Sequence, residues 1–298
     1  MKKKQFFKTI AITSTSKEKR ILDIARQCCE VILNSQIKVL VSDNLSLLSS
    51  LTKVKNASDE DIITQSDLLI CIGGDGTMLS SARRFGFFGL PMLGINLGKL
   101  GFLTDIAPKD ITTSLLEVIN GEYIEDERFF LEATTTSSEP HLALNEVVIH
   151  SGAVAQLIEY EVYIDDVFVY RQSADGLIIN SPTGSTAYSL SGGGPIVHPG
   201  VNAITLLPMF PHSLSSSSLI VGGASKISIK MIPGKGRGRA KLSMDSHDTV
   251  LLKSKEIINI IKATPILRLI HPKNHDFYFG CRNKLGWSSV ISNKKEDK

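Results

Sequence analysis

The segment Asp67–Leu79, DLLICIGGDGTML, joins an apolar strand, a glycine-rich turn and the start of a helix. Residues Asp67–Ile72 have the composition of a buried strand, and TMLSSARRF from Thr77 onward is typical of a helix. Glycines let the backbone approach a ligand closely, and the helix that follows presents free N–H groups to an anion. An acid in the middle, Asp75, would repel phosphates, so it indicates proton or metal chemistry in phosphoryl transfer.

The loop Gly73–Thr77 departs from three familiar phosphate-binding patterns. G-x-G-x-x-G requires a glycine where Leu79 stands, and the acid expected about 20 residues further on is missing. The Walker-like run Gly94–Leu100 has too few residues between its glycines and ends in leucine. The HRD and DFG triplets of protein kinases are absent. A tight turn whose Asp75 and Thr77 cap a helix is the structural alternative, but capping does not require three glycines around one acid.

Outward from this loop, the chain has two different patterns of predicted secondary structure. In residues 1–108 strands alternate with helices, which predicts a Rossmann-like open α/β domain with a mostly parallel sheet. In residues 109–271, after a helix over Ile111–Asn120, strand follows strand, which predicts an all-β domain resembling a β-sandwich. Asp165–Asp166 is typical of a hairpin turn between two of these strands. Residues 272–298 form a C-terminal segment with a polar end.

Composition narrows the possible partners and location. The 298 residues are 42% hydrophobic and 21% charged, with a net charge of +3 and no large basic block, so nucleic acid is not an expected partner. No apolar run has the length of a membrane span, and Lys8 interrupts the N-terminal apolar run, so we expect neither membrane insertion nor a signal peptide. The four cysteines lack CxxC spacing, which predicts free thiols and a cytoplasmic protein and does not fit a zinc site. No residue is assigned as a metal ligand.

Three further motifs accompany GGDGT, a sequence that NAD kinases share with lipid kinases and phosphofructokinases. LNEVVIH (Leu144–His150) resembles the Asn-Glu motif of the NAD kinase family. DGLIINSPTGSTAYSLSGGGPIVHP (Asp175–Pro199) resembles its glycine- and threonine-rich signature, and ITLLPMFPHSL (Ile204–Leu214) resembles the segment that follows. The order and spacing match, so the resemblance to the family extends over nearly the whole chain.

The resemblance implies a bacterial-type NAD kinase, which uses ATP to phosphorylate the 2′-hydroxyl of the adenosine ribose of NAD and so produces NADP. It also implies Mg²⁺ or another divalent cation with ATP, a homodimer or homotetramer, and a C-terminal segment that returns to the α/β domain. Two alternatives stay open, with a dehydrogenase as a weaker third. Another GGDGT-type lipid or sugar kinase would not need the Asn145–Glu146 motif together with TGSTAYS. A non-catalytic NAD sensor would gain nothing from Asp75.

The resemblance also implies roles for particular residues. Asp75 matches the general base and, together with Gly76, an NAD contact, while Gly73, Gly74, Gly76 and Thr77 form the loop that faces the phosphates of ATP. The other implied NAD-binding residues are Phe102, Asn145, Glu146, Gln156, Ser173, Asp175, Thr186, Ala187, Tyr188, Ser189, Leu190, Ser191, His212 and His247.

Several of these positions have a structural alternative or depart from the family pattern. Phe102 could be plain core packing, His212 could be a structural histidine in a turn, and Ser185 or Thr186 could cap a helix. Relatives often carry Gln at the position of His247, and many carry a basic residue at the position of Ser173. The phosphate contact made by that basic side chain is therefore not expected here.

Overall fold

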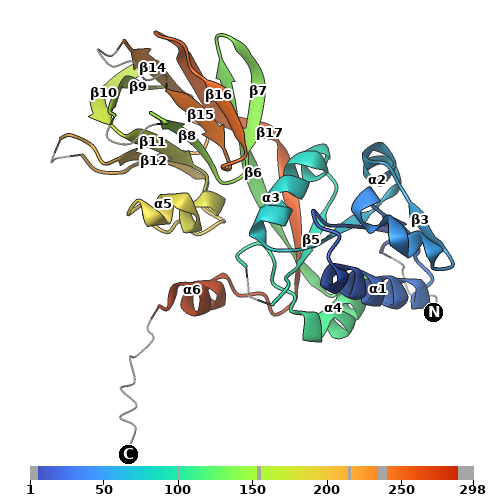
Figure 1. The fold of residues 1–298 in the computed structure, drawn as a ribbon. Coiled ribbons are helices and arrows are strands. Elements are labelled where there is room, and N and C mark those ends of the chain that lie inside the picture. The colour runs from blue at the N-terminus through green and yellow to red at the C-terminus, as the bar shows by residue number, and fades with distance from the viewer. Residues whose placement is uncertain (1–5, 99–100, 153–155, 214–215, 234–239, 288–298) are drawn as a thin grey trace, which may run out of the picture. The chain divides into compact units, whose positions relative to one another are not determined.

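The computed structural model describes residues 6–98, 101–152, 156–213, 216–233 and 240–287 (Figure 1). The chain divides into two compact units. Unit 1 comprises Met1–Met78, Pro91–Asp126 and Ile270–Lys298, and unit 2 comprises Leu79–Leu90 and Glu127–Leu269. None of the helices among the described residues is long and apolar enough to cross a membrane.

Unit 1 is built on a parallel sheet whose strands pair in the order β5-β4-β1-β2-β3. The strands are β1 (Thr9–Thr13), β2 (Lys38–Val41), β3 (Val54–Asn56), β4 (Leu68–Ile72) and β5 (Met92–Ile95). Both β1 (TIAIT) and β4 (LLICI) are buried along their whole length, as expected for largely apolar strands in a sheet covered on both faces. Parallel pairing brings the carboxyl ends of these strands to one edge of the sheet.

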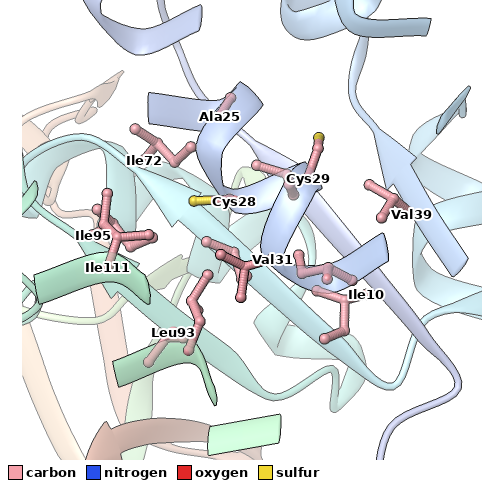
Figure 2. Packing of buried hydrophobic residues seen from close by; sticks show 14 of the residues in the cluster. Ile10, Ala25, Cys28, Cys29, Val31, Val39, Ile72, Leu93, Ile95 and Ile111 are labelled. Carbon is pink, nitrogen blue, oxygen red and sulfur yellow. The ribbon is translucent and has the colours of Figure 1, made fainter. Parts of the chain in front are cut away.

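The helices of unit 1 are α1 (Lys19–Asn34), α2 (Asp59–Gln65), α4 (Ile111–Ile119) and α6 (Phe277–Leu285), with short 3₁₀ turns at Asp43–Ser50 and Pro108–Asp110. Helix α1 buries residues at a 3.6-residue period: Ile21, Ile24, Ala25, Cys28, Cys29, Val31 and Ile32. Figure 2 shows Ala25, Cys28, Cys29 and Val31 of α1 in one cluster with Ile10, Val39, Ile72 and Leu93 of the sheet and Ile111 of α4. This packing fixes the layer from which the glycine loop leaves.

The thiols of unit 1 belong to its core. Cys28, Cys29, Cys71 and Cys281 are all free and buried, which confirms the prediction of unpaired thiols. Both Cys28 and Cys29 lie in the packed cluster of Figure 2. Burial raises the pKa of the Cys29 thiol to about 12 and also raises the pKa of Cys28. Since the thiolate is the reactive form, burial disfavours reaction of this adjacent pair, and both side chains pack with the apolar cluster of unit 1.

Unit 2 contains two antiparallel sheets. One includes β9 (Ile158–Ile164), β10 (Val167–Ala174), β14 (Ile227–Ile232) and β17 (Ile257–Pro272), in the order β10-β9-β14-β17. The other has the order β13-β12-β11-β8-β15-β16. Its strands are β8 (Glu146–His150), β11 (Gly176–Asn180), β12 (Ala203–Met209), β13 (Leu219–Gly222), β15 (Lys241–Met244) and β16 (Asp248–Leu251). One apolar cluster draws residues from both sheets, including Tyr160, Ile229, Val147 and Leu177, which confirms the predicted sandwich-like arrangement.

Shorter elements complete the chain. Strand β6 (Tyr123–Thr135) pairs with β7 (Ser138–Ala143), and both β6 and β17 contain residues of both units, as does α3 (Asp75–Arg84). The 3₁₀ turns Gly86–Phe88 and Thr183–Thr186 and the helix α5 (Tyr188–Ser191) belong to unit 2. Asp165 and Asp166 both have positive φ, 51° and 65°, and turn β9 into β10 as predicted.

The compact units do not follow the predicted limits of 1–108, 109–271 and 272–298. Unit 1 continues to Asp126 because α4 buries Ile111, Leu115 and Val118 in the same cluster as α1. Unit 1 also includes the C-terminal part of the chain from Ile270 onward. Residues Leu79–Leu90, which lie within the predicted first domain, belong to unit 2.

Candidate active site

The glycine loop leaves the carboxyl end of β4 and leads directly into α3. The Gly73 N–H donates to the carbonyl of Ile95 (2.9 Å), and the Met78 N–H donates to the carbonyl of Gly74 (3.2 Å). The loop therefore lies at the edge of the parallel sheet where open α/β folds bind ligands. A Cβ at Gly73 would overlap the Thr77 side chain, whereas a Cβ at Gly74 or Gly76 would meet open space. Gly73 serves packing, and the exposed backbone at the other two glycines is free to approach a ligand.

The Asp75 carboxylate is held by groups distant in sequence. Its Oδ2 accepts from the Phe102 N–H (3.0 Å) and from Lys284 Nζ (2.6 Å), and its Oδ1 accepts from the Leu103 N–H (3.0 Å). A Cβ at Gly101 would overlap the carboxylate, so glycine is required there by close approach. These bonds lead away from α3, so the side chain does not serve as a cap of that helix. Oδ1 accepts one of the three bonds and retains a lone pair for a further donor.

Phe102 lies beside this carboxylate rather than in an apolar core. It is half-buried, Lys284 Nζ lies 4.6 Å from its ring centroid, and the ring of Phe277 lies 6.4 Å away. A cation over an aromatic face is attracted by the ring quadrupole. Lys284 and Phe277, both in α6, are functional candidates that sequence analysis missed.

In unit 2, the predicted pair Asn145–Glu146 is buried at the start of β8. Its backbone is bound by Asp245, which follows β15 with a positive φ of 46°. Asp245 Oδ1 accepts from the N–H groups of Asn145 (2.8 Å) and Glu146 (3.2 Å), and its Oδ2 accepts from the Leu144 N–H (2.9 Å). Arg83 Nη1 completes the arrangement at 2.7 Å from Asp245 Oδ2. Neither Asp245 nor Arg83 was predicted, since nothing local marks them.

Burial raises the pKa of Glu146 to about 8, and the neighbouring Asp245 carboxylate adds to the shift. Glu146 therefore carries its proton at neutral pH and can donate a hydrogen bond as well as accept one. Asn145 Oδ1, Glu146 Oε2, Asn180 Oδ1 and Ser189 Oγ are buried atoms for which the described part of the chain provides no hydrogen-bond partner. Such atoms are rare in folded proteins. Asn180 lies opposite Glu146 in the β8–β11 pairing, so the atoms of Asn145, Glu146 and Asn180 mark a place where a polar ligand would supply the partners.

The segment Thr183–Ser191 packs against this pair. A Cβ at Gly184 would overlap the Asn145 carbonyl, so the turn lies directly on the backbone of the motif. Ser185 Oγ accepts from the Val197 N–H (3.0 Å), and Thr186 Oγ1 donates to the Thr183 carbonyl (3.4 Å). Neither side chain caps α5, so the helix-capping alternative for these residues is wrong.

The remaining predicted residues form smaller groups. Asp175 and Tyr188 line one cavity of about 530 Å³ in unit 2, together with His150 and Ser243. The His212 N–H donates to the Ser173 carbonyl (2.9 Å), which places that pair together. Thr186, Ala187 and Leu190 are half-buried, whereas Gln156, Ser191, His212 and His247 are exposed. His247 follows Asp245 in the same turn, where its N–H donates to the Met244 carbonyl (3.0 Å).

An acid-bearing glycine loop at the open edge of a parallel sheet, together with a buried polar pair on a β-sandwich, defines a kinase of the GGDGT class. Residues 9–123 match the family described as ATP-NAD kinase N-terminal domain, and residues 144–271 match the ATP-NAD kinase C-terminal domain. The chain belongs to the NAD kinase family and is a phosphotransferase.

Relatives and solved structures agree with this assignment. The chain is 42% identical to the NAD kinase of Teredinibacter turnerae over 95% of both chains. It is 40% identical to that of Marinobacter nauticus over 96% of this chain and 98% of the relative. Yeast NADH kinase in complex with NADH is similar with a TM-score of 0.84 and 28% identity, over 97% of this chain and 90% of that one. An NAD kinase from Archaeoglobus fulgidus in complex with ATP shares the fold, with a TM-score of 0.71 and 23% identity, over 93% and 97%.

The raised pKa of Glu146 makes stability depend on pH. Protonated Glu146 stabilises the folded state fully below its unfolded pKa, near 4.5, and this contribution is lost as pH rises towards about 8. The side chain of Glu146→Gln does not titrate, so the variant does not lose this contribution. The unfolding free energy of the variant minus that of the parent should therefore increase between pH 4.5 and about 8 by up to a few kcal/mol, at about 1.4 kcal/mol per pKa unit. Denaturant unfolding of the ligand-free protein at several pH values measures this. Glu139→Gln, at an exposed position on β7, should follow the parent, and parallel profiles for Glu146→Gln would contradict the assignment.

Breaking the buried Arg83–Asp245 ion pair should strongly destabilise the folded protein. Asp245→Asn removes the charge and turns an amide N–H towards backbone N–H donors, which leaves Arg83 and part of the β8 backbone without partners. We expect the unfolding free energy to fall by about 3 kcal/mol or more in denaturant titration, the scale for breaking a buried pair. Lys226→Met, which breaks the exposed pair with Asp166, should cost less than about 1 kcal/mol. Equal losses in the two variants would show that burial does not set the strength of the Asp245 pair.

Proposed function

We propose that this protein transfers the γ-phosphoryl group of ATP to the 2′-hydroxyl of the adenosine ribose of NAD, with Asp75 as the general base. The observation that carries this role is the position of the Asp75 carboxylate. It is anchored by two backbone N–H groups and Lys284 in a loop whose Gly74 and Gly76 leave the backbone open. Membership of the NAD kinase family supports the acceptor and the donor.

Asp75 has the chemistry for this step. Its Oδ1 can accept a hydrogen bond from the ribose hydroxyl and take the proton as the oxygen attacks the γ-phosphorus. Because the Phe102 and Leu103 N–H groups and Lys284 hold the carboxylate in place, it need not reorganise during the reaction. The exposed N–H groups at the start of α3 suit the phosphates of the nucleotide.

Unit 2 supplies groups that suit NAD. Asn145 Oδ1 can accept from an exocyclic amine or a hydroxyl, and protonated Glu146 can donate to a ring nitrogen or a ribose oxygen. Asp175 and Tyr188, which share a cavity, are proposed to contact further ribose or base atoms. For Phe102, Gln156, Ser173, the stretch Thr186–Ser191, His212 and His247, the proposal of NAD binding depends on the match to the family motif.

Magnesium fits this scheme as a companion of ATP. Mg²⁺ prefers oxygen ligands, usually one or two carboxylates with substrate phosphates and water. The Asp75 oxygens already accept three hydrogen bonds, and the metal-ligand cluster found among the described residues, Asp105–His271–His275, contains two imidazoles and does not suit Mg²⁺. We therefore propose that the ion is held by the phosphates, whose charge it offsets. When bound there, it would polarise the transferring phosphoryl group.

Two further properties are proposed with the function. The four free, buried thiols support a reducing, cytoplasmic environment. Val167, Phe168 and Val169 are exposed on the β9–β10 hairpin, and such an apolar edge supports a homodimer or homotetramer. Assay with NAD and ATP, against diacylglycerol and fructose 6-phosphate as acceptors, tests the reaction itself.

Asp75→Asn tests the general base. The amide cannot take the hydroxyl proton, so kcat should fall by roughly 10²–10⁴-fold in steady-state kinetics. The amide also turns an N–H towards one of the donors that hold Asp75, so NAD binding by calorimetry should be measured on the same variant. Lys284→Met keeps the carboxylate and should retain far more activity. If Lys284→Met loses as much kcat as Asp75→Asn, the ion pair and not proton transfer carries the effect.

Gly76→Ala tests the close approach of ligand to the loop. A Cβ there meets no protein atom and alanine favours a helix, so the unfolding free energy should stay constant or rise by up to about 1 kcal/mol. A displaced ligand should lower kcat/KM by roughly 10- to 100-fold. Gly222→Ala, also facing open space but on β13, should leave kcat/KM unchanged. Full activity of Gly76→Ala would mean that no ligand lies against this residue.

A further inference from the structure

Three side chains of unit 1 converge on one point outside the glycine loop. His271, near the end of β17, and His275, just before α6, stack with ring centroids 3.9 Å apart and an interplanar angle of 20°. Their Nδ1 atoms lie 2.9 Å and 2.8 Å from the same oxygen, Asp105 Oδ2. The ligand atoms of the three residues all lie within 4.8 Å of one another, and His271 is 1% exposed.

Hydrogen bonding alone leaves this cluster incomplete. If both Nδ1 atoms carry protons and donate to Asp105, the Nε2 of a neutral His271 is a buried acceptor without a donor among the described residues. Asp126 Oδ2, at 3.9 Å, is the carboxylate that faces this nitrogen. Asp105 Oδ1 is likewise buried without a partner in the described chain. Buried polar atoms of this kind are unusual and indicate a missing binding partner.

Asp105 supplies the acidic ligand of this cluster. Its Oδ2 faces both imidazole Nδ1 atoms, and its Oδ1 is buried without a partner among the described residues. A carboxylate is the form in which an acidic side chain binds a metal.

We propose that Asp105, His271 and His275 form a binding site for a divalent transition metal of the zinc type, coordinated by both Nδ1 atoms and an Asp105 carboxylate oxygen. Nitrogen and oxygen ligands about 2.0–2.2 Å from a tetrahedral zinc ion lie about 3.2–3.5 Å from one another. The present separations of 2.8 and 2.9 Å therefore need to open by only a few tenths of an ångström. Two imidazoles and one carboxylate favour zinc over magnesium or calcium.

Metal binding also assigns a role to Asp126 and to the space beside the cluster. With Nδ1 on the metal, His271 presents its Nε2–H to the Asp126 carboxylate, the usual arrangement behind a metal-bound histidine. Asp105 and His275 line a cavity of about 400 Å³ together with Asn274 and Phe277, so the ion can enter. The same cavity leaves a fourth coordination position open to water.

The site joins the two segments that hold Asp75. Asp105 lies two residues after Leu103, whose N–H binds the Asp75 carboxylate, and His275 lies two residues before α6, which carries Lys284. A bound ion would tie these segments together and stabilise unit 1. This inference does not depend on the identity of the substrate, and its test uses binding and stability, so it can fail while the proposed kinase activity holds.

Equilibrium dialysis of the tag-free, chelator-treated full chain against Zn²⁺ should show one tightly bound ion and a raised melting temperature. His275→Asn places an amide N–H where Nδ1 was, which keeps a donor to Asp105 but removes a metal ligand. Mutating residues that only hydrogen-bond to metal ligands typically lowers metal affinity roughly 10- to 100-fold, so removing a direct ligand in His275→Asn should lower the Zn²⁺ affinity by more than this. The melting temperature of the metal-free variant should stay near that of the parent. His198→Ala, at an exposed histidine of unit 2, should bind like the parent. Equal uptake by His275→Asn and the parent, or no stoichiometric uptake by either, would overturn the proposal.

Co²⁺ substitution gives a readout on the unmodified protein. A tetrahedral site of nitrogen and oxygen ligands should produce visible absorption bands without thiolate charge-transfer bands. Thiolate bands would assign the ion to Cys28, Cys29, Cys71 or Cys281 instead and defeat the proposal. Loss of the visible bands in His275→Asn would support it.

Discussion

Each unit depends on a carboxylate that accepts consecutive backbone N–H groups and one basic side chain. In unit 1 Asp75 accepts from Phe102, Leu103 and Lys284, and in unit 2 Asp245 accepts from residues 144–146 and from Arg83. A partly or fully buried carboxylate is costly without such donors, and a loop with free N–H groups is equally unsatisfied without an acceptor. Each carboxylate therefore determines the path of a loop, and the loop determines where the carboxylate lies.

The two carboxylates differ in what they leave available. Asp245 has a side chain that is 0% exposed, and its oxygens accept three N–H groups and Arg83, so it acts on the backbone of Asn145 and Glu146. Asp75 is 27% exposed and keeps acceptor capacity at Oδ1. The same kind of bonding thus gives a structural anchor in one unit and a candidate base in the other. Their surroundings, not the residue type, separate the two roles.

Burial and nearby charged groups change the protonation and hydrogen bonding of Glu146 and of the Asp105–His271–His275 cluster. Burial raises the pKa of Glu146, and Asp245, which holds the backbone of that residue, adds to the shift by repelling its negative charge, so the carboxyl stays protonated near neutral pH. At Asp105, burial acts to raise the pKa of the carboxyl, but hydrogen bonds and charge from His271 and His275 outweigh burial and lower that pKa. In both places buried oxygen or nitrogen atoms have no partner in the described chain, and we interpret each as a place for a ligand: polar groups of a dinucleotide in one, a metal ion in the other.

The sequence by itself determined what depends on neighbours a few residues apart. Apolar runs specified β1 and β4, the 3.6-residue period specified α1, and Asp165–Asp166 specified a hairpin turn, because the backbone conformation at each place depends on local side chains. The four motifs were enough to indicate the family. Tertiary structure alone decided the partners of the functional groups: Lys284 is 209 residues from Asp75, Asp245 is 101 residues from Leu144, and His271 is 166 residues from Asp105. Such pairs form only when β strands and α6 pack, and single side chains carry no local signal of a partner so far along the chain.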